Sequence, residues 1–280
     1  MKIGVIGNGF VGKSTNVLKN ENVSIYFYDI NSSLCQPIGL TLNDMKECDI
    51  IFVSVPTPMN KDKSICLDIV NSVVTDLRKI KYNGFIVIRS TVIPGTSDSL
   101  NVYFMPEFLT EKNFINDFKS NPLWVFGLLN SETDEKFKET ITKLFTYAYE
   151  SKCIESNQIK WMINKEAEMV KYFRNTFLSV KVSFCNEMYQ YCKLKGIDYE
   201  TVRQVAASDK RIGLSHTQVP GHDNKFGFGG TCFPKDTNAL LSDMKTNKMN
   251  SFILESATQR NENVDRKEQE WFSKKGRAVV

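Results

Sequence analysis

The feature that most restricts the fold lies at the start of the chain. Lys2–Ile6 is a short apolar run that predicts a strand, and glycines at positions 7, 9 and 12 follow it directly, before a helical run to Asn20. In a dinucleotide-binding strand, turn and helix, the first glycine makes the tight turn and the second lets a pyrophosphate approach the backbone. The third allows the helix to pack closely on the strand. The order and spacing therefore predict a dinucleotide site at Gly7–Gly12.

The same letters also fit a second pattern. Gly7, four further residues and Gly12-Lys13-Ser14 spell the phosphate-binding loop of nucleoside triphosphatases. However, the next predicted strand ends in Asp29, and a carboxylate at that point binds the ribose 2′-hydroxyl of NAD and repels the extra phosphate of NADP. A triphosphatase would instead need an acidic residue for magnesium after a later strand, and the apolar run 50–55 ends in Pro56-Thr57-Pro58. Asp29 therefore favours a site for NAD.

Strand and helix patterns alternate along the rest of the first half. We expect strands near 49–55, 84–89, 102–105 and 123–128, and a helix near 66–80. Alternation of this kind predicts an α/β, Rossmann-like fold with a doubly wound, mostly parallel sheet and helices on both faces. Ligands of such sheets bind beyond the carboxyl ends of the strands. The polar segments Ser90–Thr96 and Met105–Glu111 fall there, although either can also be ordinary turn chemistry.

A long helical pattern begins near Asn164. Apolar residues recur at three- and four-residue spacing up to Gly196, which predicts one long helix with a buried face. Lys171 and Asn175 are four residues apart and share one side of this helix, where an ammonium and an amide can face the same ligand atom. The alternative is a solvated lysine beside a polar neighbour.

The most specific motif runs from Gly227 to Asp236 and reads Gly-Phe-Gly-Gly-Thr-Cys-Phe-Pro-Lys-Asp. Its glycines remove side chains from a loop that another group approaches closely, and Pro234 suits the first turn of a helix. Cys232 then lies at the helix entrance, where the helix dipole and Lys235 both favour the thiolate. The motif predicts a reactive cysteine, and the alternative is an inert thiol in a glycine-rich turn.

Composition argues against several other functions. The seven cysteines are odd in number, contain no Cys-x-x-Cys pair and follow no signal peptide, which favours a reduced cytoplasmic setting over a disulfide framework. With only two histidines, we expect no metal site. No apolar run approaches the roughly 20 residues that cross a bilayer. The net charge of +4 is spread along the chain, without the basic, aromatic stripe of a nucleic-acid site.

Taken together, these residues resemble a known family, the nucleotide-sugar 6-dehydrogenases that act on UDP-glucose or GDP-mannose. UDP-glucose 6-dehydrogenase is the most similar type. The resemblance covers nearly the whole chain in order. It rests on the glycine turn at 7–12, Asp29, Val53–Pro58, Arg89–Val92, Pro106–Leu109, Lys171 with Asn175, Arg211–Gly213 and Gly227–Asp236. The last segment is far more specific than the glycine turn.

This resemblance implies a four-electron oxidation of the C6 hydroxyl of a nucleotide sugar, such as UDP-glucose to UDP-glucuronate, with two NAD per turnover. Cys232 would capture the C6 aldehyde as a thiohemiacetal, and a second hydride transfer would leave a thioester. Lys171 and Asn175 would stabilise the oxyanion. A covalent sulfur intermediate divides one difficult oxidation into two steps and retains a reactive aldehyde.

The remaining roles are also implied by the resemblance. Asp236 and Thr91 would handle a water, and Glu107 would assist proton movement and thioester hydrolysis. The implied cofactor contacts are Gly7, Gly9, Phe10, Val11, Gly12, Asp29, Val55, Pro56, Thr57, Ser90, Thr91, Glu111 and Lys235. The implied substrate contacts are Glu107, Phe108, Leu109, Lys171, Asn175, Arg211, Phe226, Gly229 and Lys235.

The domain organisation follows the same resemblance. We expect a NAD-binding Rossmann domain at 1–160 and a helical central domain at 161–280, which carries the cysteine loop and forms a homodimer through the long helix. Full-length members continue into a second α/β domain that helps to bind the nucleotide. This chain instead ends in the charged stretch Asn261–Val280, which reads as a helix end and tail. The segment Asn31–Leu42 also looks shorter than in relatives.

Two alternative functions stay open. The 3-hydroxyacid dehydrogenases share an N-terminal dinucleotide domain, a long helix and a lysine and asparagine pair, but they would transfer one hydride and ignore Cys232. A non-catalytic protein that binds NAD or a nucleotide sugar would show no turnover.

Overall fold

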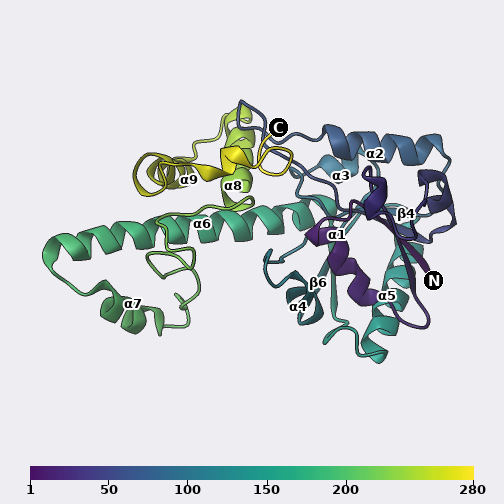
Figure 1. Ribbon diagram of the computed structural model, residues 1–280, viewed down its shortest axis with the longest axis horizontal. Coiled ribbons are helices and arrows are strands. Elements are labelled where there is room, and N and C mark those ends of the chain that lie inside the picture. Colours follow the sequence, from purple (N-terminus) through teal and green to yellow (C-terminus); the bar gives the residue numbers. More distant parts are fainter. The chain divides into compact units, whose positions relative to one another are not determined.

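The computed structural model describes residues 1–280, and the chain forms two compact units (Figure 1). The first unit contains Met1–Thr57 and Leu67–Lys171. The second contains Pro58–Cys66 and Tyr172–Val280. Helix α6 (Asn164–Lys195) begins in the first unit and continues in the second.

A seven-stranded sheet forms the centre of the first unit. In the order in which they pair, its strands are β2 (Ser24–Tyr28), β1 (Lys2–Ile6), β3 (Ile50–Val53), β4 (Phe85–Ile88), β5 (Tyr103–Phe104), β6 (Trp124–Leu128) and β7 (Ile159–Ile163). All neighbouring strands run parallel except β5 and β6. The predicted doubly wound, mostly parallel sheet is confirmed.

Helices cover both faces of this sheet. One face is covered by α4 (Phe114–Lys119) and α5 (Asp134–Glu150), whose buried apolar residues are Phe118, Phe137, Ile141, Leu144, Phe145 and Ala148. The other face is covered by α2 (Asp68–Lys79) and the start of α6, through Val70, Val74 and Ala167. Because both faces are covered, a strand such as β3 is apolar and buried at every position.

The strand order indicates where a ligand would bind at the edge of the sheet. The chain runs from β1 outward to β2 and then returns to β3 on the other side of β1. The carboxyl ends of β1 and β3 therefore flank the switch point at which open α/β sheets bind ligands. The glycine turn follows β1, and Val55-Pro56-Thr57 follows β3.

Some elements differ from the expectation. The helix after the glycine turn, α1, covers only Phe10–Ser14 and continues as a 3₁₀ turn, η1, at Thr15–Leu18. Two 3₁₀ turns, η2 (Ser32–Leu34) and η3 (Leu42–Glu47), stand between β2 and β3 where a full helix would be usual. The sequence analysis did not predict α3 (Thr96–Ser99), α4, α5 or β7.

The second unit is helical. Helix α6 ends as predicted at Gly196, which has φ of 67°, and the Ile197 N–H donates to the Cys192 carbonyl oxygen at 2.9 Å to close the helix. The chain continues through α7 (Tyr199–Ala207), α8 (Phe233–Thr246) and α9 (Phe252–Arg260). None of the helices combines the length and apolar character needed to cross a bilayer.

The stretch interpreted as a helix end and charged tail is instead folded. It contains the π-helical turn η4 (Asn261–Asp265) and the 3₁₀ turn η5 (Glu270–Ser273). Trp271 is fully buried with Met59, and the Met59 N–H donates to the Ala278 carbonyl oxygen at 2.8 Å. Charged residues dominate its composition, but a few apolar side chains and buried polar partners are enough to pack it.

Candidate active site

The glycine turn has the three properties of a dinucleotide turn. Gly7 adopts φ of 92°, a value that favours glycine. A Cβ on Gly12 would lie 1.9 Å from the Gly7 carbonyl oxygen, so only glycine lets α1 pack this closely. No atom lies within 4 Å of the place that a Cβ on Gly9 would take, and this leaves room for a pyrophosphate. Phe10 and Val11 follow in the first turn of α1, both half-buried.

Asp29 lies at the end of β2, beside the turn. Its Oδ2 accepts a hydrogen bond from the Asn8 N–H at 2.8 Å, and its Oδ1 accepts one from the Asn31 N–H at 2.9 Å. The two oxygens of a carboxylate offer about four acceptor positions. Both oxygens can therefore also accept ribose hydroxyls, and the residues of this site fit NAD.

Arg89 is a buried cation to which the sequence analysis gave no role. It directly follows β4 and is only 2% exposed, and burial lowers its pKa to about 10. Its Nη1 donates to the Val11 carbonyl oxygen at 3.1 Å and to Thr15 Oγ1 at 2.5 Å. The guanidinium therefore binds α1 at a carbonyl oxygen of its first turn and at the hydroxyl of its C-cap residue. An arginine that directly follows an apolar strand is the only signal for it in the sequence.

The predicted residues at the other strand exits lie close to the backbone of β3 and β4. Ser90 Oγ donates to the Val55 carbonyl oxygen at 2.6 Å and so joins the two exits. Of the remaining predicted residues at these exits, Thr57 and Thr91 are buried and Pro56 is exposed.

Helix α6 fixes the loop that follows Ser90. The carboxylate of Glu168, which is fully buried, accepts the Gly95 N–H at 2.5 Å and the Ser97 N–H at 2.8 Å. Burial raises the pKa of Glu168 above its ordinary value. This contact orders the loop that carries Thr91.

A buried ion pair joins Glu107 to Lys171 within the first unit. Lys171 Nζ donates to Glu107 Oε1 at 2.7 Å and to the Glu107 carbonyl oxygen at 2.8 Å. Glu107 Oε2 accepts the Leu109 N–H at 2.9 Å. The lysine and glutamate side chains are 5% and 6% exposed. The pair fixes an ammonium and a carboxylate in one water-poor place.

In the second unit, Asp236 binds two of the predicted residues. Asn175 Nδ2 donates to Asp236 Oδ2 at 2.5 Å, and Lys235 Nζ donates to Asp236 Oδ1. Asp236 has no exposed surface. Lys171 and Asn175, the pair that the sequence analysis placed on one side of α6, each bind a different carboxylate, because buried polar groups take partners. Lys235 was expected to favour the Cys232 thiolate, and in the structure its ammonium binds Asp236.

Cys232 occupies the N-cap position of α8, and Pro234 lies in the first turn, as the motif predicted. The Asp236 N–H donates to the Cys232 carbonyl oxygen at 2.8 Å, which closes this turn. The thiol is half-buried. Cys232 therefore combines partial exposure with a helix entrance, a setting that favours thiolate chemistry.

The other predicted residues have varied surroundings. Arg211 is exposed and paired with Asp209 at 2.5 Å, and Glu111 is exposed. Phe108 and Leu109 are half-buried. The Phe226 ring lies 5.5 Å from the Tyr189 ring.

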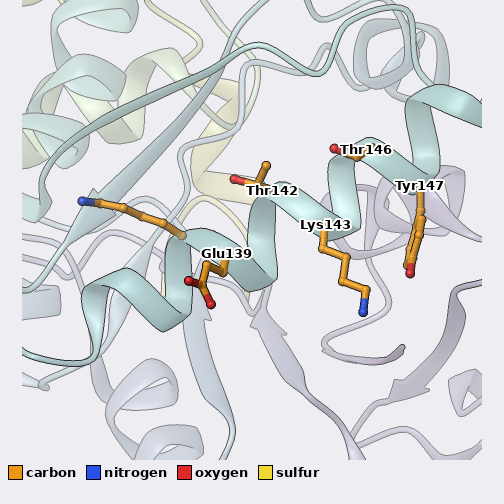
Figure 2. Close-up of a pocket in the computed structure, with 6 residues that line it drawn as sticks. Glu139, Thr142, Lys143, Thr146 and Tyr147 are labelled. Carbon is orange, nitrogen blue, oxygen red and sulfur yellow. The ribbon is translucent and has the colours of Figure 1, made fainter.

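A surface pocket on α5 of the first unit contains none of these residues (Figure 2). Every side chain that lines it belongs to α5, namely Lys138, Glu139, Thr142, Lys143, Thr146 and Tyr147. A ligand site normally encloses most of its ligand, and one helix face does not. We therefore do not assign the pocket to the site.

Two domain models of one family match the chain. The NAD binding domain of the UDP-glucose/GDP-mannose dehydrogenase family matches residues 40–148, and the central domain of the same family matches residues 165–263. The chain belongs to this family. NAD is its cofactor, as predicted. The two matched ranges contain all the predicted catalytic residues, whereas the glycine turn and Asp29 precede the first range.

Individual members of the UDP-glucose/GDP-mannose dehydrogenase family show the extent of the similarity. The chain is 31% identical over 235 residues to a UDP-glucose 6-dehydrogenase of Pseudomonas aeruginosa, a match that covers 78% of this chain and 49% of the relative. It thus spans about half the length of that relative. A solved UDP-glucose dehydrogenase from Pyrobaculum islandicum superposes with a TM-score of 0.79 at 26% identity, covering 93% of this chain and 68% of the other.

The fold is also shared outside the UDP-glucose/GDP-mannose dehydrogenases. A 3-hydroxyisobutyrate dehydrogenase of Mycobacterium tuberculosis superposes with a TM-score of 0.68, covering 92% of this chain and 91% of the other. The identity is only 13%, so this likeness concerns the fold alone.

Proposed function

We propose that this protein is an NAD-dependent nucleotide-sugar 6-dehydrogenase that oxidises a sugar C6 hydroxyl to a carboxylate through Cys232. The observation that carries the proposal is a half-buried cysteine at the N-cap of α8, one turn before a buried Asp236 that binds Asn175 and Lys235. A two-electron dehydrogenase has no need for such a cysteine. UDP-glucose is the proposed substrate, because the relative from Pseudomonas aeruginosa and the solved protein from Pyrobaculum islandicum are named for it.

The proposed reaction has three steps. First, the C6 alcohol loses a hydride and a proton and becomes an aldehyde. The Cys232 thiolate then adds to the aldehyde carbon, and the thiohemiacetal loses a second hydride to become a thioester. Finally, water attacks the thioester, the C–S bond breaks, and carboxylate and thiol are released. Bound NAD would accept the hydride in each of the two oxidations.

The chain's own residues supply charge and proton transfer. Lys171 and Asn175, four residues apart on α6, would stabilise the oxyanion that forms when the thiolate adds. Asp236 and Thr91 would hold the water, and Glu107 would take the proton that the water loses in hydrolysis. The Lys171–Glu107 pair and the Asn175–Asp236 pair are assigned to one reaction because of the family and because Lys171 and Asn175 lie on the same helix.

The proposed cofactor contacts follow the glycine turn and the strand exits. Gly9 would face the pyrophosphate, Asp29 the ribose hydroxyls, and Val55 to Thr57 with Ser90 the rest of the cofactor. All seven cysteines are free thiols, which agrees with the proposed cytoplasmic setting.

We also propose that two chains associate through α6. Four aromatic residues on one side of the part of α6 that belongs to the second unit are more than half exposed, namely Phe173 (63%), Phe177 (59%), Phe184 (61%) and Tyr191 (54%). The last three repeat every seven residues, which aligns them in one stripe along a helix. A stripe that matches a second copy of itself would bury these rings in a two-fold homodimer.

The decisive experiment measures NADH and product. The purified protein is incubated with NAD and a panel of UDP- and GDP-sugars, NADH is followed by absorbance, and the product is identified by mass. We expect two NADH per nucleotide sugar and a uronate. One NADH per substrate would indicate the 3-hydroxyacid type of reaction, and bound NAD without any NADH would indicate a binding protein. Either result would contradict the proposal.

A variant isolates the role of the thiol. Cys232→Ser removes the better nucleophile, so we expect the uronate product to be lost, with a fall in kcat of at least about 10². Cys66→Ser, a change at another half-buried cysteine, is the matched control and should keep both oxidations.

A further inference from the structure

The glycine-rich loop before Cys232 packs against the folded stretch 261–270 of the same unit. This stretch lies about thirty residues after the cysteine in the sequence, and its charged composition gives no sign of a role. Two of its side chains, Asn261 and Arg266, are buried and directed at the loop.

Asn261 binds both backbone groups of one loop residue. Its Oδ1 accepts the Phe228 N–H at 2.8 Å, and its Nδ2 donates to the Phe228 carbonyl oxygen at 2.9 Å. Asn261 has no exposed surface. A pair of bonds of this kind fixes both the position and the orientation of the peptide at Phe228, as a neighbouring strand would. The preceding Gly227 N–H is held by Asn186 Oδ1 at 3.1 Å.

Arg266 ties the two ends of the loop together. Its guanidinium donates to Asp223 Oδ2 at 2.6 Å and to both oxygens of Glu270, at 2.6 and 3.0 Å. Its Nη1 also donates to the Phe226 carbonyl oxygen at 3.4 Å. Glu270 in turn accepts the Gly230 N–H at 3.3 Å. Charge-assisted bonds in this planar arrangement hold their partners more firmly than neutral ones.

These two side chains explain two of the three loop glycines. A Cβ on Gly227 would lie 2.2 Å from Asn261 Oδ1, and a Cβ on Gly229 would lie 2.3 Å from Arg266 Cζ. At Gly230, in contrast, no atom lies within 4 Å of the Cβ position. The motif was predicted to be approached closely by another group. At Gly227 and Gly229 that group is part of the protein itself.

We propose that Asn261 and Arg266 are positioning residues that hold Cys232 at the entrance of α8 by fixing the loop Phe226–Gly230. This inference rests on the proposed role of Cys232 as nucleophile. Only Thr231 separates the fixed loop from the cysteine, so movement of the loop would displace the thiol from the N-cap, where the helix dipole favours the thiolate.

The test measures the thiol directly and needs no turnover. The purified protein is treated with iodoacetamide at a series of pH values, and alkylation of each cysteine is followed by peptide mass. The variants are Asn261→Ala, Asn261→Asp and Arg266→Lys. Asn263→Asp, the same change at an exposed asparagine in the same turn, is the matched control. The buried Cys185 and Cys192 of the same unit report on its folding.

We expect the alkylation rate of Cys232 at about pH 7 to fall about tenfold in the three variants, the equivalent of one or two lost hydrogen bonds. The midpoint of its pH profile should move upward, and Cys185 and Cys192 should stay protected. The control should match the unmodified protein. An unchanged Cys232 profile would overturn the inference. So would rapid labelling of Cys185 and Cys192 in every variant, because the side chains would then support the fold and not the loop. Failure of the proposed reaction is a separate result, since it appears only in the NADH assay.

Discussion

The buried pair of Glu107 and Lys171 shows how two charges are held together out of contact with water. Each side chain is almost completely removed from water, and each satisfies the charge of the other. Removing one member of a buried pair leaves an uncompensated charge, which costs far more than removing both. Pairs such as this hold a charge in place before a substrate arrives, which is what stabilisation of a developing oxyanion requires.

Lys171→Met is therefore expected to lower the free energy of unfolding by about 3 to 5 kcal/mol, because Glu107 remains buried and unpaired. The double variant with Glu107→Gln should recover part of this loss. Urea unfolding followed by tryptophan fluorescence measures both, since Trp124 and Trp161 lie in the same unit. Lys165→Met, at an exposed position of the same helix, is the control and should change stability by no more than about 0.5 kcal/mol. An equally small effect at Lys171 would show that the pair is not needed for folding.

Glu168 gives a prediction about pH. Burial raises its pKa in the folded state above the ordinary value of 4.5, so the folded state binds the proton more tightly than the unfolded state. Its favourable contribution is complete below that ordinary value and is lost as the pH rises through the raised pKa. The stability of the unmodified protein relative to Glu168→Gln should thus fall as the pH rises above the ordinary value of 4.5, by about 1.4 kcal/mol for each unit of the shift. Urea unfolding of both proteins at a series of pH values below and above 4.5 measures this difference in unfolding free energy. A relative stability that increases with pH would contradict the assignment.

At the scale of elements, the first helix shows how a short segment is made rigid enough to receive a phosphate. Helix α1 has only five residues, too few to be stable alone. Gly12, in the middle of the helix, lies against the backbone of Gly7, and the buried Arg89 binds Val11 in the first turn and Thr15 just after the last residue. The glycines within this element have separate tasks, and substitutions can separate them.

Gly12→Ala should affect both the stability of the protein and its affinity for NAD, whereas Gly9→Ala should affect only the affinity for NAD. The first places a Cβ 1.9 Å from a carbonyl oxygen, so we expect a loss of about 1 to 3 kcal/mol in unfolding free energy together with weaker NAD binding. The second meets no protein atom, so the thermal midpoint should stay the same while the Kd for NAD rises about tenfold, equivalent to about 1.4 kcal/mol. Thermal unfolding and calorimetric titration with NAD measure the two effects. A stable Gly9→Ala protein with unchanged NAD affinity would place the pyrophosphate elsewhere.

At the scale of the whole molecule, the exposed rings of α6 are costly for a protein that remains a single chain. Large apolar surface in water favours association, at about 25 cal/mol for each Å² that is buried. Association through α6 would also bring the second units of two chains into one dimer.

We therefore expect the protein to have about twice the 32.0 kDa mass of one chain when measured by light scattering after gel filtration. Phe177→Asp with Phe184→Asp should reduce the mass to that of one chain, because a buried carboxylate without a partner opposes association. Tyr149→Asp, which changes an exposed aromatic residue of α5, should leave the dimer intact. A single-chain mass for the unmodified protein would rule out this interface.

Local patterns in the sequence were sufficient wherever neighbouring residues decide the structure. The strand before Gly7, the end of α6 at Gly196 and the start of α8 at Cys232 were predicted because turn, cap and periodicity rules act within a few residues. The short helices α3 and α4 and the edge strand β7 were missed, since such elements carry weak periodic signals. The 17-residue helix α5 was missed as well.

The sequence by itself thus determined the class of fold, the cofactor and the candidate nucleophile. Only the tertiary structure decided that Lys171 binds Glu107, that Asn175 binds Asp236, and that Asn261 fills the space beside Gly227. In each case the partners are dozens of residues apart. The physical reason is that a buried polar group takes whichever partner the packing of the chain brings within hydrogen-bond distance, and this choice depends on the positions of whole elements, which local sequence does not encode.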